Sequence, residues 1–404
     1  MERDKKHIAE KIHTLAESLR DEVTEFLREI IAIPSITGNE GPVVNRLKQE
    51  MERIGYDEVR VDPMGNLLGR IGLGENVIAI DGHCGTVDVG NPDLWEVAPF
   101  EAVLRDGIIY GRGACDQKGG LASAIYAGKI LKEIGIPDDT TLWVVASVME
   151  EDCEGLCWQY IVKEDKMVPQ AVILTEPSNL GIRIGQRGRM EIEVKTEGIS
   201  CHGSAPERGV NAIYRMAPII QEIERLNSRL TEHPTLGKGT VTITEIRSTA
   251  PSLCAVADSA TIHLDRRLTK GETAESAIRE VQSLPSVEAA EAKVTLLEYK
   301  EKSYTGLVYP TEAYFSLWMM EKSHPLVQSA IQAYRAQFQE EPGVDKWVFS
   351  TNGVATMGMF GIPTIGFGPG NEIYAHSPSD QVPIEHLVKA MEFYASMVQY
   401  WRAK

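Results

Sequence analysis

Several features that would place this chain in other protein classes are missing from its sequence. No apolar run approaches the ~20 residues that a membrane-spanning helix needs. The N-terminal stretch is densely charged and helical in pattern, without the apolar core of a signal peptide. Basic residues are outnumbered, with 41 Lys and Arg against 58 Asp and Glu, which gives a formal net charge of -17. These absences favour a cytoplasmic protein and argue against nucleic acid or membranes as partners.

Cysteine offers no metal-binding framework either. None of the six cysteines forms a CxxC pair. A structural zinc site built on cysteine is therefore not expected, and reduced, mostly buried thiols are predicted. Internal repeats and low-complexity segments are also absent. What is present is an ordinary globular composition, 43% hydrophobic and 25% charged, in a chain long enough for two domains.

Strand-like apolar runs alternate with helical patterns in the first part of the chain. The runs are VIAIDGH, TLWVVASV and AVILTE, and residues 119–134 and 153–163 have helical patterns. Such alternation predicts an α/β fold with a mostly parallel sheet and helices on both faces. Sites in these folds gather at the carboxyl ends of the strands.

The pattern changes near Gly185. The segments RMEIEVKTEGI, TVTITEIRS and ADSATIHLDRRL alternate as half-exposed antiparallel strands do, and two helical stretches accompany them. We therefore expect an inserted α+β domain at residues 186–298. Residues 1–185 and 299–404 then form the α/β domain.

Acids and histidines stand at the ends of strand-like runs, namely at His83, Asp116, Glu150, Glu151, Glu176 and His376. Buried charges need partners, so a soluble protein rarely places such residues there for stability. Five ligand-type residues and one spare carboxylate are what a two-metal hydrolytic site requires. Adjacent Glu150 and Glu151 could divide the roles of base and ligand, because consecutive side chains at a strand end point in different directions.

Six motifs follow one another along the chain: GHCGTVD, YGRGACDQKGG, SVMEEDCEG, LTEPSN, SCHGSAPERGVNA and GPGNEIYAHSPSD. In order and spacing they resemble the motifs of the M20 metallopeptidase and deacylase family, which includes carboxypeptidase G2-like enzymes and acetylornithine deacetylase. The resemblance covers essentially the whole chain. Further segments, among them CEGLCWQYIV and TGLVYPTEAYF, are similar to the branch described as selenium-metabolism-linked hydrolases.

The resemblance implies a site for two divalent metal ions, which we expect to be zinc, with cobalt or manganese as alternatives. Asp116 would bridge the two ions. His83 and Glu176 would complete one metal site, and Glu151 and His376 the other.

The resemblance also implies roles for neighbouring groups. Glu150 would be the general base that later returns a proton to the leaving nitrogen. A cis peptide bond is expected between Asp116 and Gln117. Glu at position 176 is typical of the carboxypeptidases and deacylases in the family.

The inserted domain is a lid and dimerisation domain by the same resemblance. In dimeric relatives the histidine that matches His202 crosses into the partner's cleft and hydrogen-bonds the substrate carbonyl. Asn211 would assist it. The alternative is that His202 is a surface turn residue, since CHGSAPERG is rich in turn formers.

Further residues are predicted to bind the substrate. Arg267 matches a position that binds a substrate carboxylate, and an Arg fork suits this task. A surface salt bridge with Asp265 is the alternative. Asn352, Gly368 and Gly370 are expected to line the cleft, because small residues let backbone N–H groups approach a ligand, or else to form only a strand-to-loop turn.

One position departs from the family pattern. Most members have an acid two residues after the first histidine, where it orients the imidazole, and this chain has Gly85. Losing such a group typically costs ~10–100-fold in metal affinity or activity. Asp88 could substitute, or a water or backbone carbonyl could serve instead. The third interpretation is a degenerate paralogue.

Together these features predict an enzyme: a homodimeric, dinuclear metal-dependent amidohydrolase or peptidase. Its substrate would be a small amide with a carboxylate, such as an N-acyl amino acid, a dipeptide or a ureido compound. One alternative is hydrolysis of a carbamoyl-type nitrogen-catabolic intermediate. The other is a weakened or silent paralogue that acts as a ligand-binding dimer, for which Gly85 is the main support.

Overall fold

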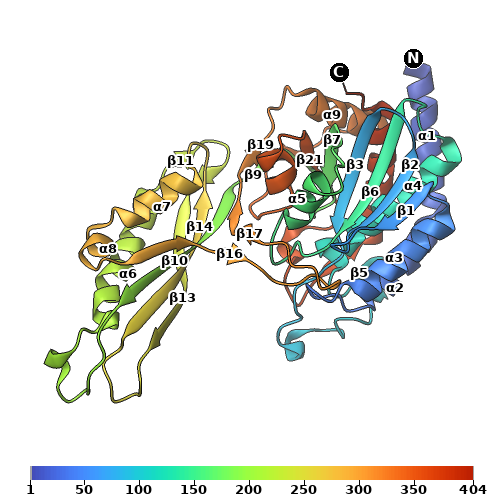
Figure 1. The fold of residues 1–404 in the computed structure, drawn as a ribbon. Helices are drawn as coiled ribbons and strands as arrows, with labels where there is room; N and C mark the ends of the chain where they lie inside the picture. The colour runs from blue at the N-terminus through green and yellow to red at the C-terminus, as the bar shows by residue number, and fades with distance from the viewer. Residues whose placement is uncertain (1, 404) are drawn as a thin grey trace.

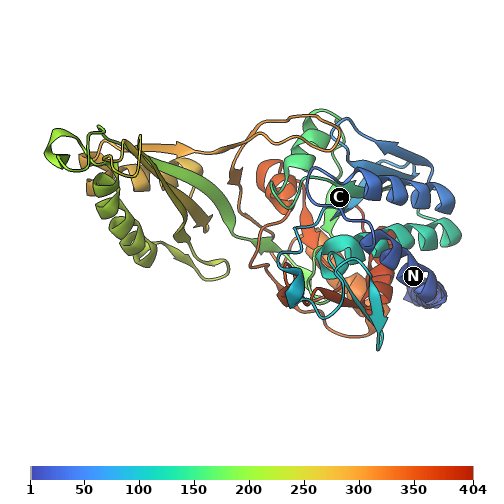
Figure 2. The ribbon, with the colours of Figure 1, turned by 90° about the horizontal axis from the view of Figure 1, so that it is seen from below.

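The computed structural model describes residues 2–403. It consists of a larger body that carries both ends of the chain and a smaller, elongated body (Figure 1). Figure 2 shows the smaller body extending away from the larger one. Each body has its own cluster of buried apolar side chains.

The larger body is built on an eight-stranded sheet with the order β1-β2-β6-β3-β7-β21-β8-β20. Strands β6, β3, β7 and β21 run parallel to one another, whereas β1 and β2 add antiparallel strands at one edge. The bounds are β1 Glu58–Val61, β2 Leu67–Gly72, β6 Thr140–Ser147, β3 Asn76–His83, β7 Ala171–Leu174, β21 Thr364–Gly366, β8 Ile182–Arg183 and β20 Val344–Asp345.

Helices cover both faces of this sheet, as the alternation along β3 demonstrates. Gly82 faces Leu121 of helix α4 (Gly119–Ile134). The neighbouring Asp81 points to the opposite face, where α5 (Leu156–Lys163) packs and Trp158 contacts it. The remaining helices are α1 Glu2–Ser18, α2 Arg20–Ile31, α3 Gly41–Ile54, α9 Pro325–Phe338 and α10 Ile384–Tyr400.

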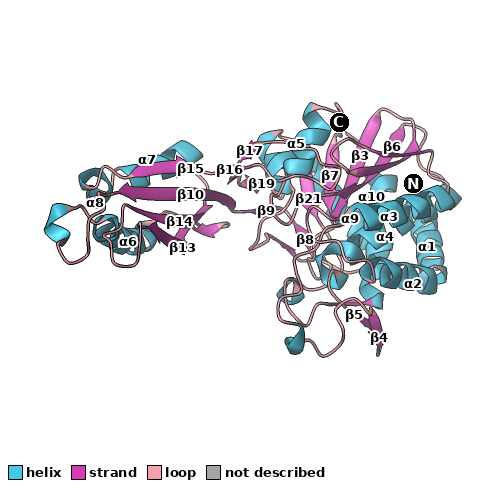
Figure 3. Cartoon of the chain, turned by 60° about the horizontal axis from the view of Figure 1, so that its bottom comes forward, coloured by secondary structure: helices cyan, strands magenta, loops and turns pink. Residues whose placement is uncertain are grey.

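The smaller body is an antiparallel sheet with the order β13-β14-β10-β15, to which β18 adds through β10. Alternate residues of β10 are buried, because α6, α7 and α8 cover one face (Figure 3). The bounds are β10 Gly188–Glu197, β13 Thr240–Thr249, β14 Ser259–Leu268, β15 Lys293–Leu296, β18 Tyr314–Phe315, α6 Ala212–Arg229, α7 Ala274–Gln282 and α8 Pro285–Ala289.

Short strands complete the fold. Three of them form a separate sheet, β4 Val103–Arg105, β5 Ile108–Tyr110 and β22 Gln381–Pro383. The others pair two by two, β9 Gly185–Gln186 with β19 Trp318–Met319, β11 Glu232–His233 with β12 Gly237–Lys238, and β16 Glu298–Tyr299 with β17 Thr311–Glu312.

The fold class predicted from the sequence is confirmed: a mostly parallel sheet with helices, plus an inserted α+β unit. The domain boundaries 1–185, 186–298 and 299–404 stay a proposal. The separate cores support them, although β18 lies beyond residue 298 and still pairs with β10.

One predicted element differs. The helix expected from residue 153 begins at Leu156, because the preceding residues form turns and Gly155 has a φ of 76°. All six cysteines are free, and four of them are buried. Among residues 2–403, no helix combines the length and the apolar character that crossing a membrane requires.

Candidate metal-binding active site

The predicted ligands converge at the carboxyl ends of the central strands. β3 ends at His83, Glu150 follows β6, and Glu176 follows β7. These strands are parallel neighbours, so their carboxyl ends meet at one edge of the sheet. Asp116 lies in the loop before α4, and the peptide bond between Asp116 and Gln117 is cis, as expected.

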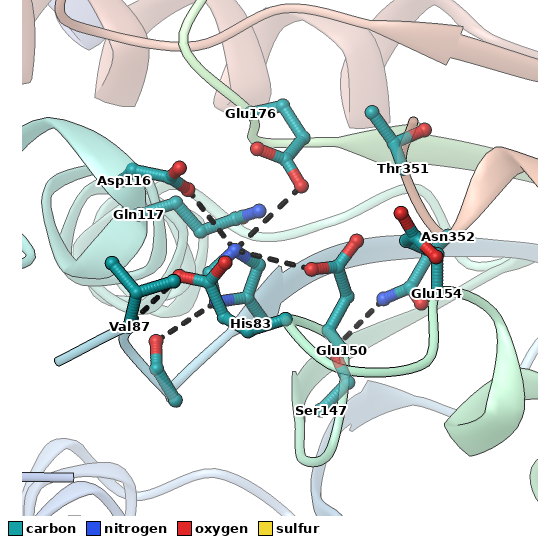
Figure 4. Close-up of polar contacts among 12 residues, drawn as sticks. His83, Val87, Asp116, Gln117, Ser147, Glu150, Glu154, Glu176, Thr351 and Asn352 are labelled. Atoms are coloured by element: carbon teal, nitrogen blue, oxygen red, sulfur yellow. Dashed lines mark hydrogen bonds and ion pairs between the residues drawn. The ribbon is translucent and has the colours of Figure 1, made fainter. Parts of the chain in front are cut away.

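His83 is the buried centre of this cluster (Figure 4). Its Nε2 lies 3.1 Å from Oδ1 of Asp116. The same nitrogen lies 3.6 Å from Oε2 of Glu150 and 3.7 Å from Oε1 of Glu176. One imidazole nitrogen therefore faces three carboxylates.

His376 approaches the cluster from the other side, on the loop after β21. Its Nε2 lies 3.3 Å from Oδ2 of Asp116 and 2.9 Å from Oε2 of Glu151. The two oxygens of Asp116 thus face two different histidines. Unlike His83, His376 is more than half exposed at its side chain.

Burial and the neighbouring charged groups shift the pKa values of these side chains. Burial raises the pKa of Glu150 and Glu176 well above the usual value, and neighbouring carboxylates raise both further. Burial alone would lower the pKa of His83, but the surrounding carboxylates, Glu150 foremost, raise it. Hydrogen bonds to Asp116 and Glu151 raise the pKa of His376 to about 10.

The donor set suits divalent cations. Four carboxylates and two imidazoles share one site, and such a concentration of negative charge needs compensation. His83, Asp116 and Glu151 have donor atoms within 4.8 Å of one another, and so do His83, Glu150 and Glu176. Oε1 of Glu150 is buried and has no hydrogen-bond partner among residues 2–403.

A backbone carbonyl takes the place of the acid that Gly85 lacks. Nδ1 of His83 lies 3.0 Å from the carbonyl oxygen of Gly85. Asp88 does not reach back to His83, because it is exposed and its carboxylate accepts the N–H of Gly90. The backbone-carbonyl interpretation is the one that the structure bears out.

A cavity of about 470 Å³ opens at the cluster and reaches the smaller body. Arg267 lines it, and its guanidinium also pairs with Asp265 through a 2.7 Å hydrogen bond. The salt bridge expected as the alternative is therefore present, and substrate binding by Arg267 stays a prediction. The Asp265 carboxylate holds the Arg267 fork at the cavity wall.

Three residues expected in the cleft do not line this cavity. Asn352 is buried, and its amide group binds Asp81 and the N–H of Gly155. Gly368 packs closely on the backbone of Thr175 and Glu176, which leaves no room for a side chain there. The N–H of Gly370 donates to His386.

The two residues of the insertion lie apart from the cavity lining of their own chain. His202 is exposed, and its Nδ1 accepts the backbone N–H of Ser204 at 3.1 Å. Asn211 caps the N-terminus of α6 by accepting the N–H of Ile213. In this chain Asn211 has a helix-capping geometry.

Sequence reasoning missed two polar contacts that shape the site. Arg189 of β10 lines the cavity and lies 2.9 Å from Glu154, which joins the two bodies. Asp380, within the quoted motif GPGNEIYAHSPSD, is buried and accepts the N–H of Cys115 at 2.8 Å. It therefore holds the loop that presents Asp116, a role that only its place four residues after His376 hinted at.

Comparisons with known proteins agree with this geometry. The chain matches the pattern of Peptidase family M20/M25/M40 over residues 79–400. It is 50% identical over 388 residues to the uncharacterized protein YgeY of Escherichia coli (strain K12), which covers 96% of each chain. It is 27% identical to the succinyl-diaminopimelate desuccinylase of Gluconacetobacter diazotrophicus, over 92% of this chain and 95% of that protein.

The fold also matches a solved structure. The crystal structure of the YXEP protein of Bacillus subtilis, described as a dinuclear metal binding peptidase from the M20 family, aligns with a TM-score of 0.67 and 14% identity. The alignment covers 95% of this chain and 98% of that one. The chain therefore belongs to the peptidase family M20/M25/M40, a family of metal-dependent hydrolases.

Proposed function

We propose that the protein hydrolyses the C–N amide bond of a small N-acyl amino acid, dipeptide or ureido compound with the help of two divalent ions. The observation that carries this proposal is the placement of Asp116. Its two oxygens face different histidines, each accompanied by a further carboxylate, Glu176 beside His83 and Glu151 beside His376. This arrangement fits one bridging carboxylate between two sites.

Zinc is the ion that the mixture of imidazole and carboxylate donors suits best, with cobalt or manganese as alternatives. Divalent ions in such a site polarise the substrate carbonyl and acidify water. The similar dinuclear metal binding peptidase of Bacillus subtilis supports the number of ions.

Glu150 supplies the proton transfers. It is buried beside the proposed ligands, and one of its oxygens has no partner among residues 2–403. A carboxylate at this place accepts a proton from the attacking water and delivers it to the leaving nitrogen.

The substrate carboxylate binds Arg267. Asp265 occupies Nε and one terminal nitrogen of the guanidinium, and the other terminal nitrogen has no partner among the described residues. A carboxylate ligand would meet that free N–H edge in the cavity. The acyl carbonyl would then lie toward the ligand cluster.

His202 acts in the partner's active site, so the working form is a homodimer. Because Nδ1 of His202 accepts the N–H of Ser204, the proton of the neutral imidazole stays on Nε2. Nε2–H is then a donor for a developing oxyanion. Exposed apolar side chains on the smaller body support an interface there: Ile199, Val210, Ile213, Tyr214, Ile246 and Leu253.

A substrate screen tests the proposal. Purified protein reconstituted with zinc is incubated with matched N-acyl amino acids, dipeptides and ureido acids that share a free carboxylate, and product amine is measured. We expect hydrolysis of at least one class, its loss on chelation and its return on adding zinc. Binding of these compounds without any hydrolysis would favour the silent ligand-binding dimer, and turnover of the ureido acids alone would narrow the substrate to a ureido compound.

A further inference from the structure

One segment contacts three of the loops that carry the proposed ligands and base, those of His83, Asp116 and Glu150. It runs from Ile30, in the last turn of α2, to Glu40, the N-cap of α3. Ser35 and Glu40 in this segment have no exposed surface. The family pattern begins only at residue 79, so the segment lies outside the part of the chain that the family comparison covers.

Ser35 forms hydrogen bonds with the chain on either side of Gly85. Its hydroxyl donates to the carbonyl of Cys84 at 2.8 Å. The N–H of Thr86 donates to the carbonyl of Ser35 at 2.9 Å. Both peptide groups that flank Gly85 are therefore held, and with them the carbonyl that orients Nδ1 of His83.

Glu40 forms a hydrogen bond with the loop that carries Glu150. Its Oε1 accepts the N–H of Met149 at 3.0 Å. Met149 has a φ of 64°, a conformation that a non-glycine residue rarely adopts without support, and it directly precedes Glu150. The same carboxylate lies beside Gly85, 3.5 Å from where a Cβ atom at that position would stand.

The loop of Asp116 is tied to the same segment. Lys118 is fully buried, and its Nζ donates to the carbonyls of Ile30 and Ile33 at 2.9 Å each. The loops of His83, Asp116 and Glu150 therefore share one support. Outer contacts of this kind typically govern metal affinity by ~10–100-fold.

We propose that Ser35 and Glu40 are positioning residues that hold the metal ligands in place of the carboxylate missing at Gly85. This inference rests on the proposed function. A backbone carbonyl cannot rotate to follow the imidazole as a side-chain carboxylate can, so its direction must be set by the peptide groups around it. Ser35 sets that direction for His83, and Glu40 sets the turn that presents Glu150 and Glu151.

The test is the zinc affinity of the whole protein, measured by competition with a chelator. We expect Ser35→Ala to weaken zinc binding by about 10-fold. The matched control is Ser396→Ala on helix α10, which removes a buried hydroxyl with a 3.0 Å hydrogen bond to Gln337 of α9. A purely structural role predicts equal losses of thermal stability and unchanged zinc affinity in both variants.

The substitution Gly85→Asn tests whether Ser35 acts through the orientation of His83. Modest room exists for a side chain at this position, and its amide oxygen can accept from Nδ1 of His83 without adding charge beside Glu40. We expect Gly85→Asn to restore most of the zinc affinity that Ser35→Ala removes. If Ser35→Ala and the double variant Ser35→Ala/Gly85→Asn lose the same amount of zinc affinity, the proposal is overturned.

Two substitutions of Glu40, one that keeps the acceptor oxygen and one that removes it, test its role. Glu40→Gln keeps an oxygen that accepts from Met149, and Glu40→Leu does not, so only the second should lose zinc affinity. Equal zinc affinity in both variants would contradict the proposal for Glu40. If the unchanged protein binds no zinc, the proposed function itself fails, whereas normal binding with insensitive Ser35 and Glu40 variants refutes only this inference.

Discussion

The two regions that carry the predicted functional residues differ in how their side chains are held. In the larger body His83, Asp116 and Glu150 are buried and converge within one chain. In the smaller body His202 is exposed and does not line the cavity at the ligand cluster. The difference teaches that the proposed metal site is complete within one chain, whereas the proposed oxyanion donor becomes useful only when a second copy supplies it.

The largest expected effect lies in the buried region. Glu150→Gln removes the proposed proton carrier while keeping the shape of the side chain, so kcat should fall by about 10²–10⁴-fold. Zinc content should stay unchanged, because Glu150 is not a proposed ligand. Steady-state kinetics and metal analysis on the same sample check both points. A variant that loses zinc together with activity would make Glu150 a ligand instead.

The exposed region should give the next largest effect. His202→Ala is expected to lower kcat by about 10²–10³-fold, the usual effect of removing an oxyanion donor. Mixing it with Glu150→Gln should then regain activity, because one site of each mixed dimer has both groups. Each variant alone should stay inactive. No recovery on mixing, or full activity of a monomer, would contradict a role across the interface.

A substitution of Arg267, in the cavity wall between the two regions, should have a smaller effect that is confined to substrate binding. Arg267→Ala removes charge-assisted hydrogen bonds worth ~1.5–3 kcal/mol, so KM for a carboxylate substrate should rise roughly 10–100-fold. Arg247→Ala is the control, since Arg247 pairs with Glu193 and Glu245 away from the cavity. The same KM change for an amide substrate without a carboxylate would argue against direct recognition.

The smallest expected effect is on how the stability of the metal-free protein depends on pH. Without metal, the pKa of Glu150, Glu176 and His376 is raised in the folded protein, to about 10 for His376. The folded state therefore binds protons that the unfolded chain releases, and this stabilisation is lost as pH rises toward 10.

Zinc should reverse that trend, because it competes with the same protons. The rise in Tm on adding zinc should grow between about pH 6 and about pH 9. Differential scanning calorimetry with and without zinc measures it. Glu150→Gln should flatten the decline of the metal-free protein, and an unchanged slope would show that the buried cluster does not control it.

The sequence was sufficient to predict much of the ligand cluster, because His83, Glu150 and Glu176 stand at the ends of strand-like runs and parallel strands bring such ends together. Asp116 and His376 lie in loops, and the resemblance to the family motifs assigned them. The residues around the ligand cluster were harder to predict from the sequence. Asn352 was expected in the cleft, but a polar residue in a loop gives no sign of which face it serves, and here it satisfies the buried Asp81.

Long-range contacts were beyond the sequence for the same reason. Nothing near Gly85 indicates that Ser35 and Glu40 support that turn, since they lie about 50 residues earlier in the chain. The pairing of Arg189 with Glu154 is equally invisible before the fold is known. Similarity to the selenium-linked branch stays a prediction, as does a cytoplasmic location.

The central claim is that Asp116 bridges two ions held by one chain. Zinc titration of the metal-free protein, followed by mass spectrometry under native conditions, tests it most directly. The account predicts two zinc ions per chain in the unchanged protein and fewer than two in Asp116→Ala, with the control Asp345→Asn unaffected. One ion or none in the unchanged protein, or two in Asp116→Ala, would contradict it.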